Sequence, residues 1–80
     1  MIPENVKTLI EQGIPGCQVT VTGDGSKFEA VVVSEAFEGM SPVKEHQLVF
    51  ATVGEHIASG AIHALTIKAY TPKEWTDRNA

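Results

Sequence analysis

The sequence predicts one α/β (α+β) domain over residues 1–80, in which a three-stranded mixed sheet packs against helices on one face. The first observation is the pattern order, which reads helix, strand, strand, helix, strand, helix. The second is a Gly-Asp-Gly-Ser turn, which joins the first two strands into an antiparallel hairpin. The third is a long helical pattern before the third strand. Such a crossover returns that strand parallel to the second one.

The first predicted helix covers residues 3–12. Pro3 suits the first turn of a helix, because its missing N–H would be unpaired there in any case. Apolar residues between Val6 and Ile10 recur at helical spacing. Gly13 stands where a left-handed residue would end the helix.

The next two segments, residues 17–22 and 27–34, predict the strands of the hairpin. Both alternate apolar and polar residues and are rich in β-branched side chains, which is typical of half-buried strands. The side chains expected to face the core are Val19, Val21, Phe28, Ala30 and Val32.

A bend over residues 35–40 follows, and Phe37 is its apolar anchor. Ser41 is a good N-cap and Pro42 a good first helical residue, so a long helix is expected from there to Gly60. Its predicted buried stripe has steps of three and four residues and contains Val43, His46, Phe50, Val53 and Ile57. His56 lies off this stripe and is expected at the surface.

The third predicted strand is IHALTIKAY, residues 62–70. Alternation places His63 on the same side as Leu65 and Ile67, and that side is expected to be buried. Thr71 and Glu74 then form a capping box, which predicts a short last helix.

Composition and charge limit the classes of function. The chain has 42% hydrophobic and 20% charged residues, one cysteine and a formal net charge of −4. The six basic residues are scattered, so weak or absent DNA binding is expected, because phosphate binding needs gathered Lys and Arg. No apolar run is long enough for a membrane span, and the first residues do not resemble a signal peptide. We therefore expect a cytoplasmic protein without an internal disulfide.

The predicted topology decides which groups can meet. A third strand parallel to the second brings His63 to the end of the sheet that carries Asp24, Ser26 and Lys27. Cys17 begins the first strand, roughly 20 Å from that turn. A metal site made of Cys17 and His63 is thereby excluded.

The sequence contains few residues in catalytic patterns, and it does not predict an enzyme. The chain lacks Cys-x-x-Cys, Gly-x-Ser-x-Gly and a glycine-rich loop that opens a helix. His63 has two readings: a histidine that donates to a nearby carbonyl, or a metal ligand that needs a second group from the turn or a partner. These residues alone leave both open.

Two segments, VTGDGSKFEAVVVSEAFEGMSPVKEHQLVF and IHALTIKAYTPKEW, resemble the BolA family, and closely its IbaG-like branch. The resemblance implies a KH-like (class II) fold and a role in stress response, including acid stress. It also implies a monothiol glutaredoxin partner that carries glutathione. The two proteins would share a [2Fe–2S] cluster, to which His63 would contribute an iron ligand.

In this branch a second ligand is expected from the turn, where Lys27 stands in place of a histidine. An ammonium is not an iron ligand, which leaves three alternatives: Asp24 or Ser26 substitutes for the histidine, the cluster is more labile, or the pair associates without a cluster. The alternative function is a KH-like nucleic-acid-binding transcriptional regulator that uses Lys44 and His46 of the long helix. The sequence leaves open whether the isolated chain is a monomer or a homodimer.

Overall fold

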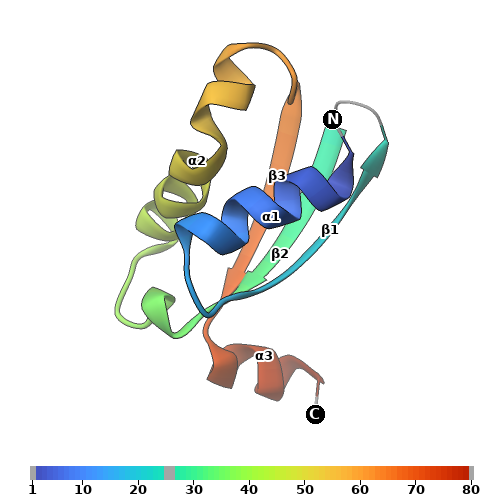
Figure 1. The fold of residues 1–80 in the computed structure, drawn as a ribbon. Helices are drawn as coiled ribbons and strands as arrows, with labels where there is room; N and C mark the ends of the chain where they lie inside the picture. Colours follow the sequence, from blue (N-terminus) through green and yellow to red (C-terminus); the bar gives the residue numbers. More distant parts are fainter. Residues whose placement is uncertain (1, 25–26, 80) are drawn as a thin grey trace.

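The computed structural model describes residues 2–24 and 27–79, and its elements follow the predicted order (Figure 1). The elements are α1 (Pro3–Gly13), β1 (Gln18–Asp24), β2 (Lys27–Val33), the 3₁₀ helix η1 (Glu35–Phe37), α2 (Pro42–Ala58), β3 (Ala64–Tyr70) and α3 (Pro72–Asn79). The α/β class is confirmed. Within these residues, no helix has the length and apolar character needed to cross a membrane.

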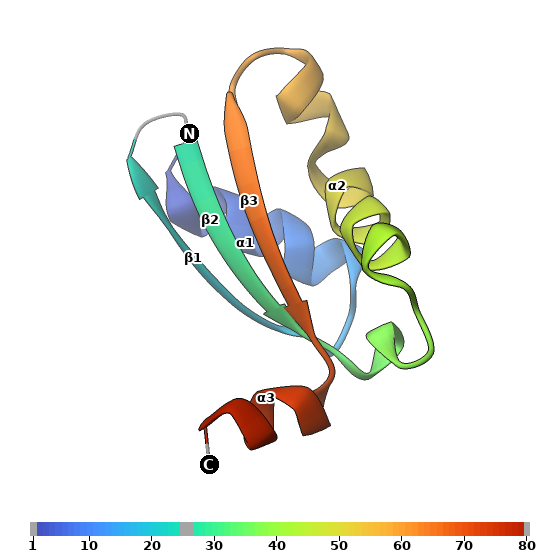
Figure 2. The ribbon, with the colours of Figure 1, turned by 180° about the vertical axis from the view of Figure 1, so that it is seen from behind.

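The three strands form one mixed sheet in the order β1-β2-β3. β1 runs antiparallel to β2, with Asp24 opposite Lys27 at the hairpin end. β2 runs parallel to β3, so that Lys27 lies opposite Ala64 at that same end. Figures 1 and 2 show α1 and α2 on one face of the sheet, while α3 lies beyond the end where β2 and β3 finish. The predicted mixed sheet, with helices on one face, is therefore confirmed.

The hydrophobic core lies between the sheet and these two helices. Phe28, Ala30 and Val32 of β2 are buried as predicted, because alternate side chains of the strand face the helices. Val19 of β1 is also buried, whereas Val21 is half-buried. Phe37 anchors the η1 bend in the core with 1% of its surface exposed.

Gly13 corrects the predicted end of the first helix. It is the last residue of α1 rather than a left-handed residue after it, and the left-handed conformation occurs at Gly16, with φ +81°. A Cβ on Gly13 would collide with the Thr52 side chain, whose own Cβ would lie 2.9 Å away. This glycine is therefore needed for the close approach of α1 to α2.

The predicted buried stripe of α2 is wrong at its N-terminal half. Val43 is 66% exposed and Phe50 39% exposed, and His46 is exposed as well. Val53 is buried as predicted, but the other buried residues are Glu45 and Val49, so that the buried positions recur every four residues. The physical reason is that α2 carries apolar residues on more than one side, so its contact with α1 decides which side is buried. The predicted N-cap is confirmed, since Ser41 Oγ accepts from the Lys44 N–H at 3.3 Å.

The capping box of α3 is also confirmed. The Thr71 N–H donates to Glu74 Oε1 at 2.9 Å, and the Glu74 N–H donates to Thr71 Oγ1 at 3.2 Å. The aromatic rings of Tyr70 and Trp75 lie 5.4 Å apart between centroids, which packs α3 against the end of β3. Arg78 stacks on the Tyr70 ring at 5.4 Å.

Glu45 is a buried acidic residue, and its ionisation makes the stability of the fold depend on pH. Its burial raises its pKa, as does the nearby Glu74 carboxylate, while His46 acts in the opposite direction. A raised pKa means that the folded state holds this proton more tightly than the unfolded state. Stability is therefore lost as pH rises from the ordinary glutamate pKa through the raised one.

We expect Glu45→Gln to increase the free energy of unfolding at pH 7 by a few tenths of a kcal/mol to about 1 kcal/mol, and to change it little at pH 4. Urea unfolding at the two pH values measures this difference. Glu38→Gln is the matched control, because Glu38 is exposed. An equal gain in the free energy of unfolding at both pH values would contradict a raised pKa of Glu45.

Candidate functional site

His63 lies in the bend directly before β3, between the buried Ile62 and the first strand residue Ala64. The imidazole is exposed, so the prediction that it lies on the buried side of the strand is wrong. The strand begins two residues later than predicted, and Ile62 occupies the core in place of His63. From Leu65 onward the predicted alternation holds, with Ile67 buried.

The sheet register nevertheless brings His63 to the hairpin end, as predicted. Ala64 is the register partner of Lys27, and Lys27 is the register partner of Asp24. Both Lys27 and Asp24 are exposed. Ser26, the third turn residue considered as a ligand, lies outside the described residues. His63, Lys27 and Asp24 therefore share one solvent-facing end of the sheet.

An exposed neutral imidazole suits a borderline metal such as iron. The Lys27 ammonium does not, because it has no lone pair to offer until it loses its proton. Over residues 2–24 and 27–79, no group of three or more His, Cys, Asp and Glu side chains is placed to hold a metal ion. The described chain thus offers His63 as one ligand, and a metal bound there needs further donors from another molecule.

Cys17 lies at the opposite end of the molecule, one residue before β1 begins. The neighbouring Gln18 pairs with Val33, the last residue of β2, whereas His63 is near the first residue of β2. Six strand steps separate the two ends by roughly 20 Å. Burial raises the pKa of the Cys17 thiol, and the Glu11 carboxylate raises it further, so the thiolate is disfavoured. The predicted separation of Cys17 from His63 is confirmed.

The other two histidines, His46 and His56, both belong to α2. His46 and Lys44 are exposed near the start of α2, beside the end of β2. His56 is half-buried rather than at the surface as predicted, and it lines a shallow hollow of about 300 Å³ with residues of α1. Its backbone carbonyl accepts from the Ile62 N–H at 3.1 Å, so the end of α2 ties down the segment before His63.

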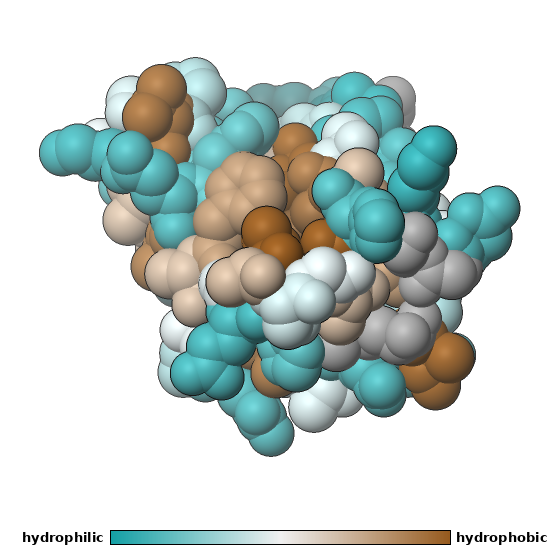
Figure 3. All heavy atoms as spheres, turned by 90° about the horizontal axis from the view of Figure 1, so that it is seen from above, coloured by the Kyte–Doolittle hydropathy of each residue, from teal (hydrophilic) through white to brown (hydrophobic). Residues whose placement is uncertain are grey.

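Apolar surface accompanies the hairpin end of the molecule. Figure 3 views this end from above and shows apolar side chains gathered near its middle, with hydrophilic side chains around them. Ile57 of α2 and Leu65 of β3 are only half-buried where they pack on the core. Ile2, just before α1, is 57% exposed. The strand and helix periodicities did not reveal this surface, because it collects residues from the ends of several elements.

Comparisons with known proteins agree on one family. A family model described as BolA-like protein matches residues 11–74. The acid stress protein IbaG of Escherichia coli strain K12 is 53% identical over 70 residues, which cover 88% of this chain and 83% of that protein.

Solved structures show the same similarity. A bolA protein homologue from Coxiella burnetii superposes with a TM-score of 0.86 at 40% identity, covering 95% of this chain and 97% of that chain. The BolA domain of SufE1 from Arabidopsis thaliana superposes with a TM-score of 0.79 at 31% identity, covering 90% and 93% of the respective chains.

Proposed function

The chain belongs to the BolA family, and from this membership we propose that it is a non-enzymatic cytoplasmic adaptor that pairs with a monothiol glutaredoxin and handles [2Fe–2S] clusters with it. The observation that carries the proposal is the position of His63. It is an exposed imidazole at the hairpin end of the sheet, where the described chain offers no complete metal site of its own. A single imidazole ligand can take part in holding a metal centre when a second protein supplies the remaining ligands.

The cluster is the cargo of this pair rather than a resident cofactor of the chain. The glutaredoxin would supply a cysteine thiolate and bound glutathione, and His63 would supply one nitrogen ligand to iron. Replacement of a thiolate by a neutral imidazole removes negative charge from the cluster and changes its reduction potential. The apolar surface at the hairpin end supports this proposal, since exposed apolar patches often mark protein contacts. The similarity to an acid stress protein supports a role in stress response.

Complex formation tests the proposal directly. The chain is mixed with a glutathione-loaded monothiol glutaredoxin under cluster reconstitution, and the mixture is followed by size-exclusion chromatography and visible circular dichroism. We expect a heterodimer whose spectrum differs from that of the glutaredoxin alone. A glutaredoxin spectrum that the added chain leaves unchanged, with no heterodimer, would remove the proposal.

Lys27 sets the expected lifetime of the shared cluster. This side chain cannot ligate iron in its charged form, and the exposed Asp24 carboxylate opposite it is the remaining described candidate in the turn. We expect Lys27→His to lengthen the decay time of the reconstituted cluster by about tenfold, since the loss of even an outer-shell partner costs about 10–100-fold in metal affinity. Visible absorbance over time measures the decay.

Lys44→His is the matched control for this substitution. Lys44 is also exposed, but it lies at the start of α2, near the other end of the sheet. Equal decay times for both variants would show that the turn residue does not limit cluster lifetime. The nucleic-acid alternative, through Lys44 and His46, stays a prediction that salt-dependent binding to duplex DNA would support.

A further inference from the structure

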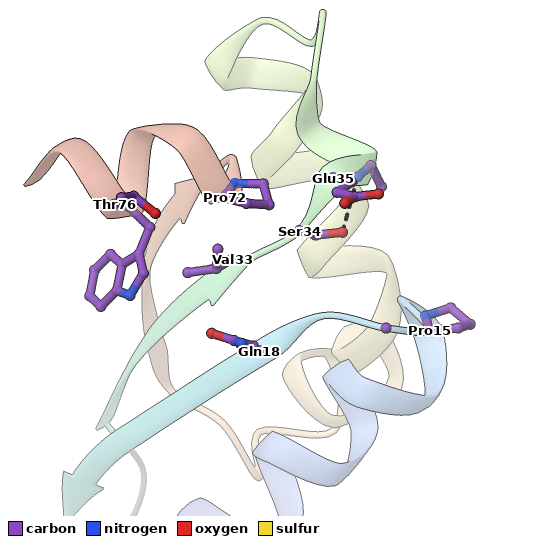
Figure 4. A pocket seen from close by; sticks show the side chains of 10 residues that line it. Pro15, Gln18, Val33, Ser34, Glu35, Pro72 and Thr76 are labelled. Carbon is purple, nitrogen blue, oxygen red and sulfur yellow. Dashed lines mark hydrogen bonds between the residues drawn. The ribbon is translucent and has the colours of Figure 1, made fainter. Parts of the chain in front are cut away.

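A cleft lies at the end of the sheet opposite His63, where β1 begins, β2 ends and α3 follows β3 (Figure 4). Its volume of about 530 Å³ is in the range of pockets that bind a small ligand or a few peptide residues. Figure 4 shows Gln18 on β1 and Val33 on β2 facing α3, with Thr76 and Glu35 on opposite sides of the opening. The proposed partnership at His63 does not use this cleft.

The walls of the cleft combine an aromatic surface with one carboxylate. Trp75, Pro72 and Val33 supply the apolar part, and Trp75 is held in place by its ring contact with Tyr70. Glu35 is exposed and is the one ionisable residue among the described residues that line the cleft. An indole and a carboxylate that line the same cleft favour a cation, above all the planar guanidinium of arginine, which stacks on aromatic faces and donates to carboxylates.

The surroundings of the cleft add negative charge. Glu38 lies in the bend after Glu35, and Asp77 lies in α3, where Lys73 and Arg78 offset part of the negative charge. Carboxylates act on their neighbours at this end: Glu11 raises the pKa of Cys17, and Glu74 raises the pKa of Glu45. The whole chain has a formal charge of −4. A basic ligand would therefore be attracted to this end and an acidic one repelled.

The open edge of the sheet favours a peptide over a small molecule. Within the described sheet β1 pairs with β2 alone, so its outer edge leaves backbone N–H and C=O groups for another extended chain. Gln18 is both the first residue of β1 and a lining residue of the cleft. A strand added along the free edge of β1 would therefore reach the cleft at Gln18, and strand addition to an open sheet edge is a common mode of peptide recognition.

We propose that this cleft binds a basic, extended segment of a partner protein, with an arginine side chain between Glu35 and Trp75 and the peptide backbone along β1. This inference goes beyond the proposed function and does not depend on it. The cleft and His63 lie at opposite ends of β2, roughly 20 Å apart, so that each can be tested without the other.

The test uses the acetylated and amidated pentapeptide Thr-Arg-Thr-Arg-Thr at low salt. Trp75 is the single tryptophan of the chain, so its fluorescence reports on the cleft. We expect a saturable fluorescence change together with NMR amide shifts at Gln18, Glu35 and Thr76, and none at His63. The matched peptide with glutamine in place of arginine is expected to bind at least about fivefold more weakly. Equal binding of the two peptides, or shifts spread evenly over the surface, would overturn the proposal.

Two glutamate variants separate the cleft from general charge attraction. Glu35→Gln is expected to weaken binding of the arginine peptide about fivefold. Glu38→Gln, at an exposed residue of the same bend that does not line the cleft, is expected to change it little. Both side chains are exposed, so both variants should keep the thermal unfolding midpoint of the parent. An equal loss of affinity in both variants would show that only net charge matters, and would reject the proposal. Free arginine amide is measured as a second control. If it binds as tightly as the peptide, the cleft does not recognise a peptide, and the proposal is rejected.

Discussion

His63→Ala is expected to abolish the visible circular dichroism of the cluster-bearing heterodimer, or to shorten the cluster lifetime about tenfold or more. The reason is that His63 is the one exposed histidine at the hairpin end among the described residues, which hold no group of three or more metal-ligating side chains. The apolar surface at that end would remain, so association of the two proteins should weaken less than cluster binding. Reconstitution followed by visible circular dichroism and size-exclusion chromatography measures both effects separately.

His46→Ala is the matched control for this result. It removes an exposed imidazole of the same size, near the start of α2 and beside the opposite end of β2. We expect the spectrum and lifetime of the cluster to stay as in the parent. If His63→Ala also left them unchanged, His63 would not be an iron ligand, although the pair could still form.

Phe37→Ala is expected to lower the free energy of unfolding by about 3–5 kcal/mol. Phe37 is the largest fully buried side chain of the described residues, and it closes the core from the η1 bend between β2 and α2. An 80-residue domain has a total stability of roughly 4–12 kcal/mol. This one substitution therefore removes a large part of that stability, and urea unfolding monitored by far-UV circular dichroism measures the loss.

Phe50→Ala is the control with the same chemical change at another phenylalanine. Phe50 is 39% exposed on the outer side of α2, so we expect a loss of about 1 kcal/mol or less. Similar losses for the two variants would contradict the observed orientation of α2. They would favour the stripe that sequence periodicity predicts, in which Phe50 faces the core.

Most of the fold was predictable because local signals and long-range topology agree. Turn chemistry marks the hairpin, a capping box marks the start of α3, and strand alternation identifies the core side of β2. The single long crossover then leaves one favoured direction for β3. The same signals were enough to predict that His63 lies near the hairpin turn and far from Cys17.

The remaining features depend on contacts between elements, which periodicity does not encode. The orientation of α2 follows from its packing against α1, where Gly13 meets Thr52. The exposure of His63 follows from a strand that starts later than its apolar pattern, because Ile62 takes the core position. The cleft beside Trp75 has no pattern at all in the sequence, since β1, β2, η1 and α3 each contribute to it.

The parallel pairing of β2 with β3 has a consequence for how the molecule assembles. The hairpin joins residues that are neighbours along the chain, such as Asp24 and Lys27, whereas Lys27 and Ala64 are separated by 37 positions (64 − 27). Closing the longer loop costs more chain entropy, so we expect β3 to join the sheet after the hairpin has formed. On this order, His63 and Lys27 come together only in the last step of sheet formation. A newly made chain could present its imidazole beside the turn only once the last strand had docked.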